Sequence, residues 1–199
     1  MKRLCIYFIL IISSIAKAYP QTKQYFPLAK SEDEAKTGDS KLDSFDVKWY
    51  SEQLGAMNEP VLYNDKSPSI VYRFTWLRSF HHPVAIRIEK QGTNYMLYWK
   101  ECDGAGGYEP GNLFVDKKKK INQAVWREFE NKIVQMHFDT MKTNIDVFGN
   151  DGASWVLEGK WDKKYHLVNR WTVGGTKDFY MCCVFLLHLT DIDTQGKVY

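Results

Sequence analysis

Alternation of apolar and polar residues marks the strands of this sequence. Between positions 70 and 80 the residues Ile70, Tyr72, Phe74 and Trp76 recur at every second position, which places them on one face of a strand. Two pairs of such segments flank short turns at Gly92-Thr93 and at Trp161-Asp162-Lys163, as in β-hairpins. The pattern predicts strands at 70–80, 84–90, 94–100, 112–118, 154–160 and 164–171.

Helical spacing of apolar residues appears in three segments. A short helix is expected over 49–57, ended by Asn58-Glu59-Pro60, since the residue before proline avoids the helical region. Asn122 is a good N-cap for a helix to Met136, and Thr176 for a last helix to Leu189. The last helix is apolar almost throughout, which predicts that it is covered on most sides or forms an interface. Hairpins rather than β-α-β crossovers indicate an α+β fold, with an antiparallel sheet and two packed helices in a single domain.

The N-terminus has the pattern of an export signal. Lys2 and Arg3 precede an apolar run, and Ala16-Lys17-Ala18 supplies small residues for signal peptidase. We expect a signal peptide at 1–18 cleaved after Ala18, with the mature protein periplasmic or secreted and the membrane met only through this transient segment. A retained N-terminal anchor is the alternative. Residues 19–46 are polar and punctuated by proline and glycine, which predicts a flexible lead-in to a single domain at 47–199.

Composition and charge narrow the function. The chain of 199 residues is 44% hydrophobic and 15% aromatic, which excludes a disordered, collagen-like or polytopic membrane protein. It carries 27 basic and 24 acidic residues. The predicted leader holds three of the basic residues and no acid, so 24 of each sign remain. Without net charge the mature chain lacks a long-range attraction to nucleic acid, and the run Lys117–Lys120 is typical of a solvated strand edge.

Three cysteines remain after the leader: Cys102, Cys182 and Cys183. An oxidising compartment allows a disulfide from Cys102 to one of the other two, and three buried thiols are the equal alternative. The pairing and the oligomeric state stay open at this point. The five histidines fall in no metal-binding motif, and His81-His82 before Pro83 is more typical of an exposed turn. The sequence therefore predicts no metal and no cofactor.

The sequence is compatible with two sets of catalytic residues for hydrolysis. Cys102 could act as a nucleophile with His166, and the glycines of the loop after Cys102 could supply backbone N–H groups. Glycines after a strand more often permit a tight bend or bulge. Alternatively a carboxylate pair drawn from Asp103, Glu109 and Glu158 could converge.

The second hairpin is the strongest constellation for binding. With the turn centred on Asp162-Lys163, Trp155 faces Arg170 and Gly159 faces His166, so Trp155, His166 and Arg170 share one face. Trp171 follows directly. A guanidinium over an indole would be a structural cation–π pair or part of a recognition surface. Trp155, His166, Arg170 and Trp171 are therefore the candidate binding residues.

Three motifs carry a resemblance. They are Trp-x-Leu-Glu-Gly followed by Tyr-His-x-Val-x-Arg-Trp at 155–171, Arg-Phe-x-Trp-Leu-Arg-x-Phe-His-x-Pro at 73–83, and Cys-x-x-Leu-Leu at 183–187. Over residues 47–192 the chain resembles a group of uncharacterised exported bacterial proteins. The resemblance implies one shared domain and a bacterial envelope location, and no activity or residue role.

Two functions are consistent with the sequence. The first is a non-enzymatic protein-binding domain of the bacterial envelope, in the manner of an immunity or inhibitor protein, because no catalytic set is recognisable. The second is an envelope hydrolase that uses Cys102 with His166 or a carboxylate pair.

Overall fold

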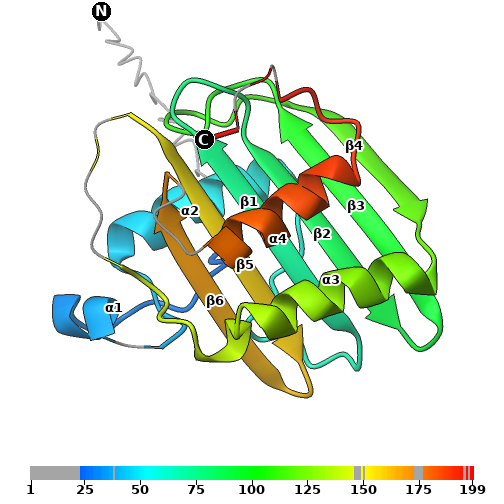
Figure 1. Ribbon diagram of the computed structural model, residues 1–199. Coiled ribbons are helices and arrows are strands. Elements are labelled where there is room, and N and C mark those ends of the chain that lie inside the picture. Colours follow the sequence, from blue (N-terminus) through cyan, green and yellow to red (C-terminus); the bar gives the residue numbers. More distant parts are fainter. Residues whose placement is uncertain are drawn as a thin grey trace, which may run out of the picture.

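The fold is an α+β fold around one antiparallel sheet, as the sequence predicts (Figure 1). The computed structural model describes residues 23–37, 39–145, 149, 151–172, 177–194, 196 and 198–199. The sheet has six strands in the order β4-β3-β2-β1-β5-β6. Their bounds are β1 (Ile70–Arg78), β2 (Val84–Gln91), β3 (Asn94–Cys102), β4 (Leu113–Lys120), β5 (Ala153–Trp161) and β6 (Lys164–Trp171).

Both predicted hairpins are confirmed, and the second has the register that the sequence predicts. The β2–β3 hairpin closes at the pair Gln91–Asn94 around Gly92-Thr93, as expected. The β5–β6 hairpin closes around Asp162 and Lys163, whose φ angles of 46° and 65° are both positive, as a type I′ turn requires. This turn fixes the register in which Trp155 faces Arg170 and Gly159 faces His166.

Helices cover both faces of the sheet. Helices α3 (Gln123–Gln135) and α4 (Lys177–His188) cross one face, and α2 (Ser44–Ala56) lies on the other (Figure 1). The first face holds the larger core, with Trp76, Trp126 and Phe179. The second holds Phe26, Leu54 and Leu167. The sheet is thus the middle layer of three.

Side-chain caps define where two of these helices begin. The Asn122 side chain accepts a hydrogen bond from the Val125 N–H at 2.9 Å, which confirms it as the N-cap of α3. Asp43 caps α2 by accepting from the Asp46 N–H at 2.8 Å, so this helix starts several residues earlier than the apolar spacing predicts. The predicted cap Thr176 lies outside the described residues.

Within the predicted lead-in 19–46, residues 23–37 and 39–46 differ from the flexible segment that the composition predicts. From residue 23 the chain packs on the sheet: Tyr25 and Phe26 are buried in the second core, and Leu28 forms a parallel bridge with Leu42. A short helix, α1 (Glu32–Thr37), lies between them. Two aromatic side chains anchor a stretch whose average composition is polar, because the burial of single large side chains supplies the stabilisation. The predicted leader 1–18 lies outside the described residues.

The lysine run forms an exposed sheet edge, as predicted. Lys117 to Lys120 belong to β4, which pairs only with β3, and their side chains are exposed. Lysines on an edge strand discourage pairing with another chain.

Over the described ranges, none of the helices combines the length and apolar character needed to cross a membrane.

Candidate functional site

Three of the four candidate binding residues lie in the core. Trp155, His166 and Arg170 are buried on the face that α3 and α4 cover. The Trp155 ring packs against the rings of Phe74 and Trp76, at centroid distances of 5.2 and 5.6 Å. These residues stabilise the fold and are not accessible to a partner.

Arg170 has a different partner from the one expected. Its guanidinium carbon lies 5.8 Å from the ring centroid of Phe179 in α4, so the expected pairing with the Trp155 indole is corrected to a contact with the covering helix. The guanidinium donates to the carbonyls of Lys142 and Thr143 at 2.8 and 2.9 Å. Burial lowers the pKa of Arg170 to about 10. It is a structural residue held by neutral acceptors.

His166 also has a structural role, because both of its ring nitrogens are hydrogen-bonded within the fold. Its Nε2–H donates to the Met141 carbonyl at 3.0 Å, which leaves Nδ1 to accept from the Ser40 hydroxyl at 2.9 Å. The ring stands edge-on to Phe138 at 5.0 Å. Burial lowers the pKa of His166, so the neutral imidazole joins β6 to the segments at 40 and 141.

The structure does not bring Cys102 and His166 together. Cys102 belongs to the core on the α2 face, whereas His166 lies on the opposite face, and strands β2, β1 and β5 separate their strands. Neighbouring strands are about 4.8 Å apart, so the two side chains lie more than about 15 Å from each other. Burial, with Asp103 and Glu101 nearby, raises the pKa of the Cys102 thiol to about 11. This pair forms no nucleophile and base.

The candidate carboxylate Glu158 lies apart from the other two, Asp103 and Glu109. Glu158 is buried in the middle of β5, where its carboxylate accepts from the Arg73 guanidinium at 2.8 Å. Asp103 and Glu109 lie in the exposed loop after β3, and Asp103 accepts from the Asn112 N–H. The glycines of that loop serve close packing: a Cβ on Gly106 would lie 2.6 Å from the Leu77 Cα.

The three cysteines of the described residues are free thiols. Cys102 is in the core on the α2 face, and Cys182 and Cys183 are in the core under α4. Since the sheet lies between them, the disulfide that the sequence allowed is not formed. Within the described ranges no group of three or more His, Cys, Asp or Glu side chains is arranged to hold a metal ion. His82 instead lies 3.0 Å from the Glu101 carboxylate.

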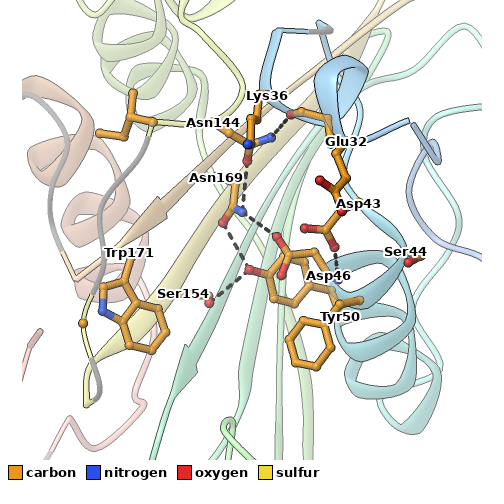
Figure 2. Close-up of a pocket in the computed structure, with 14 residues that line it drawn as sticks. Glu32, Lys36, Asp43, Ser44, Asp46, Tyr50, Asn144, Ser154, Asn169 and Trp171 are labelled. Carbon is orange, nitrogen blue, oxygen red and sulfur yellow. Dashed lines mark hydrogen bonds between the residues drawn. The ribbon is translucent and has the colours of Figure 1, made fainter. Parts of the chain in front are cut away.

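A cleft of about 630 Å³ lies where α1 and the start of α2 meet the ends of β5 and β6 (Figure 2). Trp171, the fourth candidate residue, lines it, because the register places Trp171 on the α2 face. The lining residues are Glu32, Ala35, Lys36, Asp43, Ser44, Phe45, Asp46, Tyr50, Asn144, Ile145, Gly149, Ser154, Asn169 and Trp171. This cleft combines charged, amide and aromatic side chains.

A chain of hydrogen bonds forms the floor of the cleft (Figure 2). The Tyr50 hydroxyl lies 3.1 Å from Ser154 Oγ and 3.3 Å from Asn169 Oδ1. Asn169 Nδ2 donates to Asp46 and to Asn144 Oδ1, each at 3.2 Å. Asn144 in turn donates to the Ala35 carbonyl of α1 at 2.9 Å. The floor therefore joins two helices to the sheet and holds its side chains in fixed orientations.

The electrostatics of the floor are acidic. Burial, together with the neighbouring Asp43 carboxylate, raises the pKa of Asp46 to about 6. Burial and the Asp46 charge raise the pKa of Tyr50, so its hydroxyl stays protonated. Asp46 thus changes charge close to neutral pH, in a cleft that solvent reaches.

Sequence reasoning missed Asp46, Tyr50, Asn144 and Asn169. One local signal was present: Asp43 and Asp46 have the spacing of a helix N-cap and its third helical residue, but they fell in the segment assigned to the lead-in. Asn169 lies between apolar residues of β6 on the face opposite to the candidate residues. Its partners are more than 20 residues away, so the sequence offers no spacing rule for this site.

Comparison with models of protein families and with curated proteins finds no match to this chain.

Proposed function

We propose that this chain is a non-enzymatic protein-binding domain of the bacterial envelope, and that its partner docks at the cleft between α1, α2 and β6. One observation carries the proposal: an exposed aromatic side chain stands beside a cleft whose polar floor is already fixed. Phe45 at the cleft is 69% exposed, and its ring leans on Trp49 at 5.7 Å. Aromatic anchors over a rigid site are the residues that most often dominate protein interfaces.

The envelope location rests on the sequence of the leader. The apolar run after Lys2 and Arg3 and the small residues at 16 and 18 support export. A small exported domain with an acidic, aromatic-rimmed cleft is suited to occlude part of another protein, as immunity and inhibitor proteins do.

Capture with matched variants tests this proposal. The chain from Tyr19 is immobilised as wild type, as Phe45→Ala and as Phe114→Ala, and exposed to an envelope extract of the source cells. Phe114 is the control because it is also an exposed aromatic, 54% accessible, on the distant β4 edge. We expect one protein to be retained by wild type and by Phe114→Ala and lost from Phe45→Ala. Equal retention by wild type and by both variants would contradict docking at the cleft.

A second candidate, an envelope hydrolase, is favoured by the titration of Asp46 near pH 6 in an open cleft, since a general acid needs such a pKa. Hydrolysis of a peptide or glycan substrate by wild type that disappears in a folded Asp46→Asn variant would support the enzyme and replace the binding proposal.

A further inference from the structure

We infer that the cleft receives an arginine side chain of the partner protein, with its guanidinium against the carboxylates of Asp46 and Asp43 and beside the Trp171 ring. This inference rests on the proposed function and names the chemistry of the docking segment.

The hydrogen bonds within the cleft floor leave acceptors free, so the floor suits a ligand that donates hydrogen bonds. Both amide hydrogens of Asn169 are used, by Asp46 and by Asn144. The amide nitrogen of Asn144 already donates to the Ala35 carbonyl, and the Tyr50 hydroxyl has Ser154, Asn169 and the Asp46 carboxylate as hydrogen-bond partners. What remains open is acceptor capacity, because an ionised carboxylate accepts about four hydrogen bonds and Asp46 and Asp43 each use a part of it.

Helix capping does not account for the Asp46 carboxylate. Asp43 caps α2 through the backbone N–H of residue 46, whereas the Asp46 side chain turns to Asn169 in β6. It is a carboxylate placed in the cleft floor by a contact with the sheet, and burial disfavours its charge.

A cation would satisfy this carboxylate. Among the described residues, no lysine, arginine or histidine nitrogen lies within 4.0 Å of Asp46, since the ion pairs found there involve other acids. The charged groups that line the cleft are Glu32 and Lys36 of α1 and Asp43 and Asp46 of α2. Three acids against one exposed lysine leave the cleft negative above pH 6, which favours a cationic ligand.

Arginine fits better than lysine. Its planar guanidinium donates to carboxylates in a fixed fork and stacks on aromatic rings, whereas an ammonium is a compact and more strongly hydrated charge. The cleft offers both features, since two carboxylates stand at the start of α2 and Phe45 and Trp171 belong to the same lining.

A titration followed by NMR tests the inference on the folded chain from Tyr19. The probes are N-acetyl-arginine methylamide and its neutral isostere N-acetyl-citrulline methylamide, with the lysine analogue as a third arm. We expect the arginine probe to shift the Trp171 indole N–H and Asn169 side-chain signals in a saturable way at pH 7.5. The affinity should be at least about tenfold higher than for citrulline and higher than for lysine, and should fall as the pH is lowered through 6, where Asp46 takes up its proton.

Charge-matched variants complete the test. Asp46→Asn should lose the arginine response, whereas Glu128→Gln, which removes one exposed acid on α3, should keep it. Equal affinity for arginine and citrulline, or for arginine and lysine, would overturn the inference on the wild-type protein alone, whether or not Asp46→Asn folds. If Phe45→Ala loses the captured partner while the arginine probe gives no shift, docking at the cleft stands and the arginine does not. If Phe45→Ala keeps the captured partner and Asp46→Asn keeps the arginine response, both the docking at the cleft and the arginine inference are contradicted.

Discussion

At the scale of single residues, the buried charges of this fold differ in what offsets their desolvation. Arg73 and Glu158 offset each other. Arg170 is held by backbone carbonyls, and Asp46 by the Asn169 side-chain amide and the Tyr50 hydroxyl, beside a second acid. The last two have no opposite charge among their described contacts, so their cost to folding should be measurable by substitution.

Asp46 should lower stability when it ionises. The folded chain holds this proton up to about pH 6, whereas an unfolded aspartate releases it near pH 4. Between these values the folded state binds more protons, so the free energy of unfolding falls as the pH rises. Asp46→Asn should therefore be more stable than wild type at pH 7, by up to about 3 kcal/mol, and equal to it near pH 4. Urea denaturation at both pH values measures this, and a difference that is the same at both would contradict it.

Arg170→Ala should destabilise the fold by about 2 kcal/mol or more, because it leaves buried carbonyls without donors and a cavity beneath α4. Arg170 is 5% exposed and donates to residues 142 and 143. Arg127→Ala, an exposed arginine of α3, is the control and should change stability by less than about 0.5 kcal/mol. A thermal melt of Arg170→Ala that coincides with wild type would show that the guanidinium is not a structural group.

At the scale of elements, the central strands β1 and β5 are joined on the α2 face by charge as well as by backbone pairing. Arg73 and Glu158 are register partners, and Arg73 also donates to Glu59 and to the Pro60 carbonyl in the segment after α2. Tyr165 of β6 donates to the same Glu158 carboxylate at 2.9 Å. The ion pair thus joins three strands to the segment that leaves α2.

Removing Glu158 alone should lower the stability of the fold more than replacing both Arg73 and Glu158 with apolar residues. Glu158→Ala leaves the Arg73 guanidinium buried with one partner fewer and should lower stability by about 3–5 kcal/mol. The double variant Arg73→Met with Glu158→Leu should be more stable than Glu158→Ala, since Glu59 keeps Arg87 at 3.0 Å and no cation remains unpaired. Guanidinium denaturation of the two variants and wild type decides this. A double variant as unstable as the single one would mean that the charges contribute more than their desolvation costs.

Elements that are marked by neighbouring residues, such as alternation, turn residues or an N-cap, could be predicted from the sequence. Contacts between segments that are distant in the sequence could not. Alternation and turn residues predict both hairpins and the face that Trp155 and Arg170 share, and Asn122 marks the start of α3. The anchoring of Tyr25 and Phe26 is not marked in this way, because it depends on the surface that α2 and the sheet create together. The cleft floor is of the same kind, since Asn144, Asn169 and Asp46 meet only after folding.

At the scale of the whole molecule, the sheet separates two cores that carry different chemistry. The core under α3 and α4 is closed by aromatic rings and holds the candidate residues Trp155, His166 and Arg170. The α2 side combines a smaller apolar core with the Arg73 network and the open cleft. Recognition is therefore expected on the side of the sheet that the N-terminal segment covers, and the other side serves stability.

The same separation predicts how Cys102, Cys182 and Cys183 react. Cys102 lies in one core and Cys182 and Cys183 in the other, and burial raises the pKa of Cys102 to about 11 and of Cys182 to about 12. Because the thiolate is the reactive form, an increase of two pKa units slows reaction with an aromatic disulfide reagent by about 100-fold. All three thiols should react slowly at pH 8 in the folded chain from Tyr19 and rapidly in denaturant.

Cys102→Ser should lower stability without removing an activity, because a hydroxyl replaces a packed sulfur. A single thiol that reacts fast in the folded protein, and is lost in Cys102→Ser, would instead place a reactive cysteine within reach of solvent and favour the hydrolase.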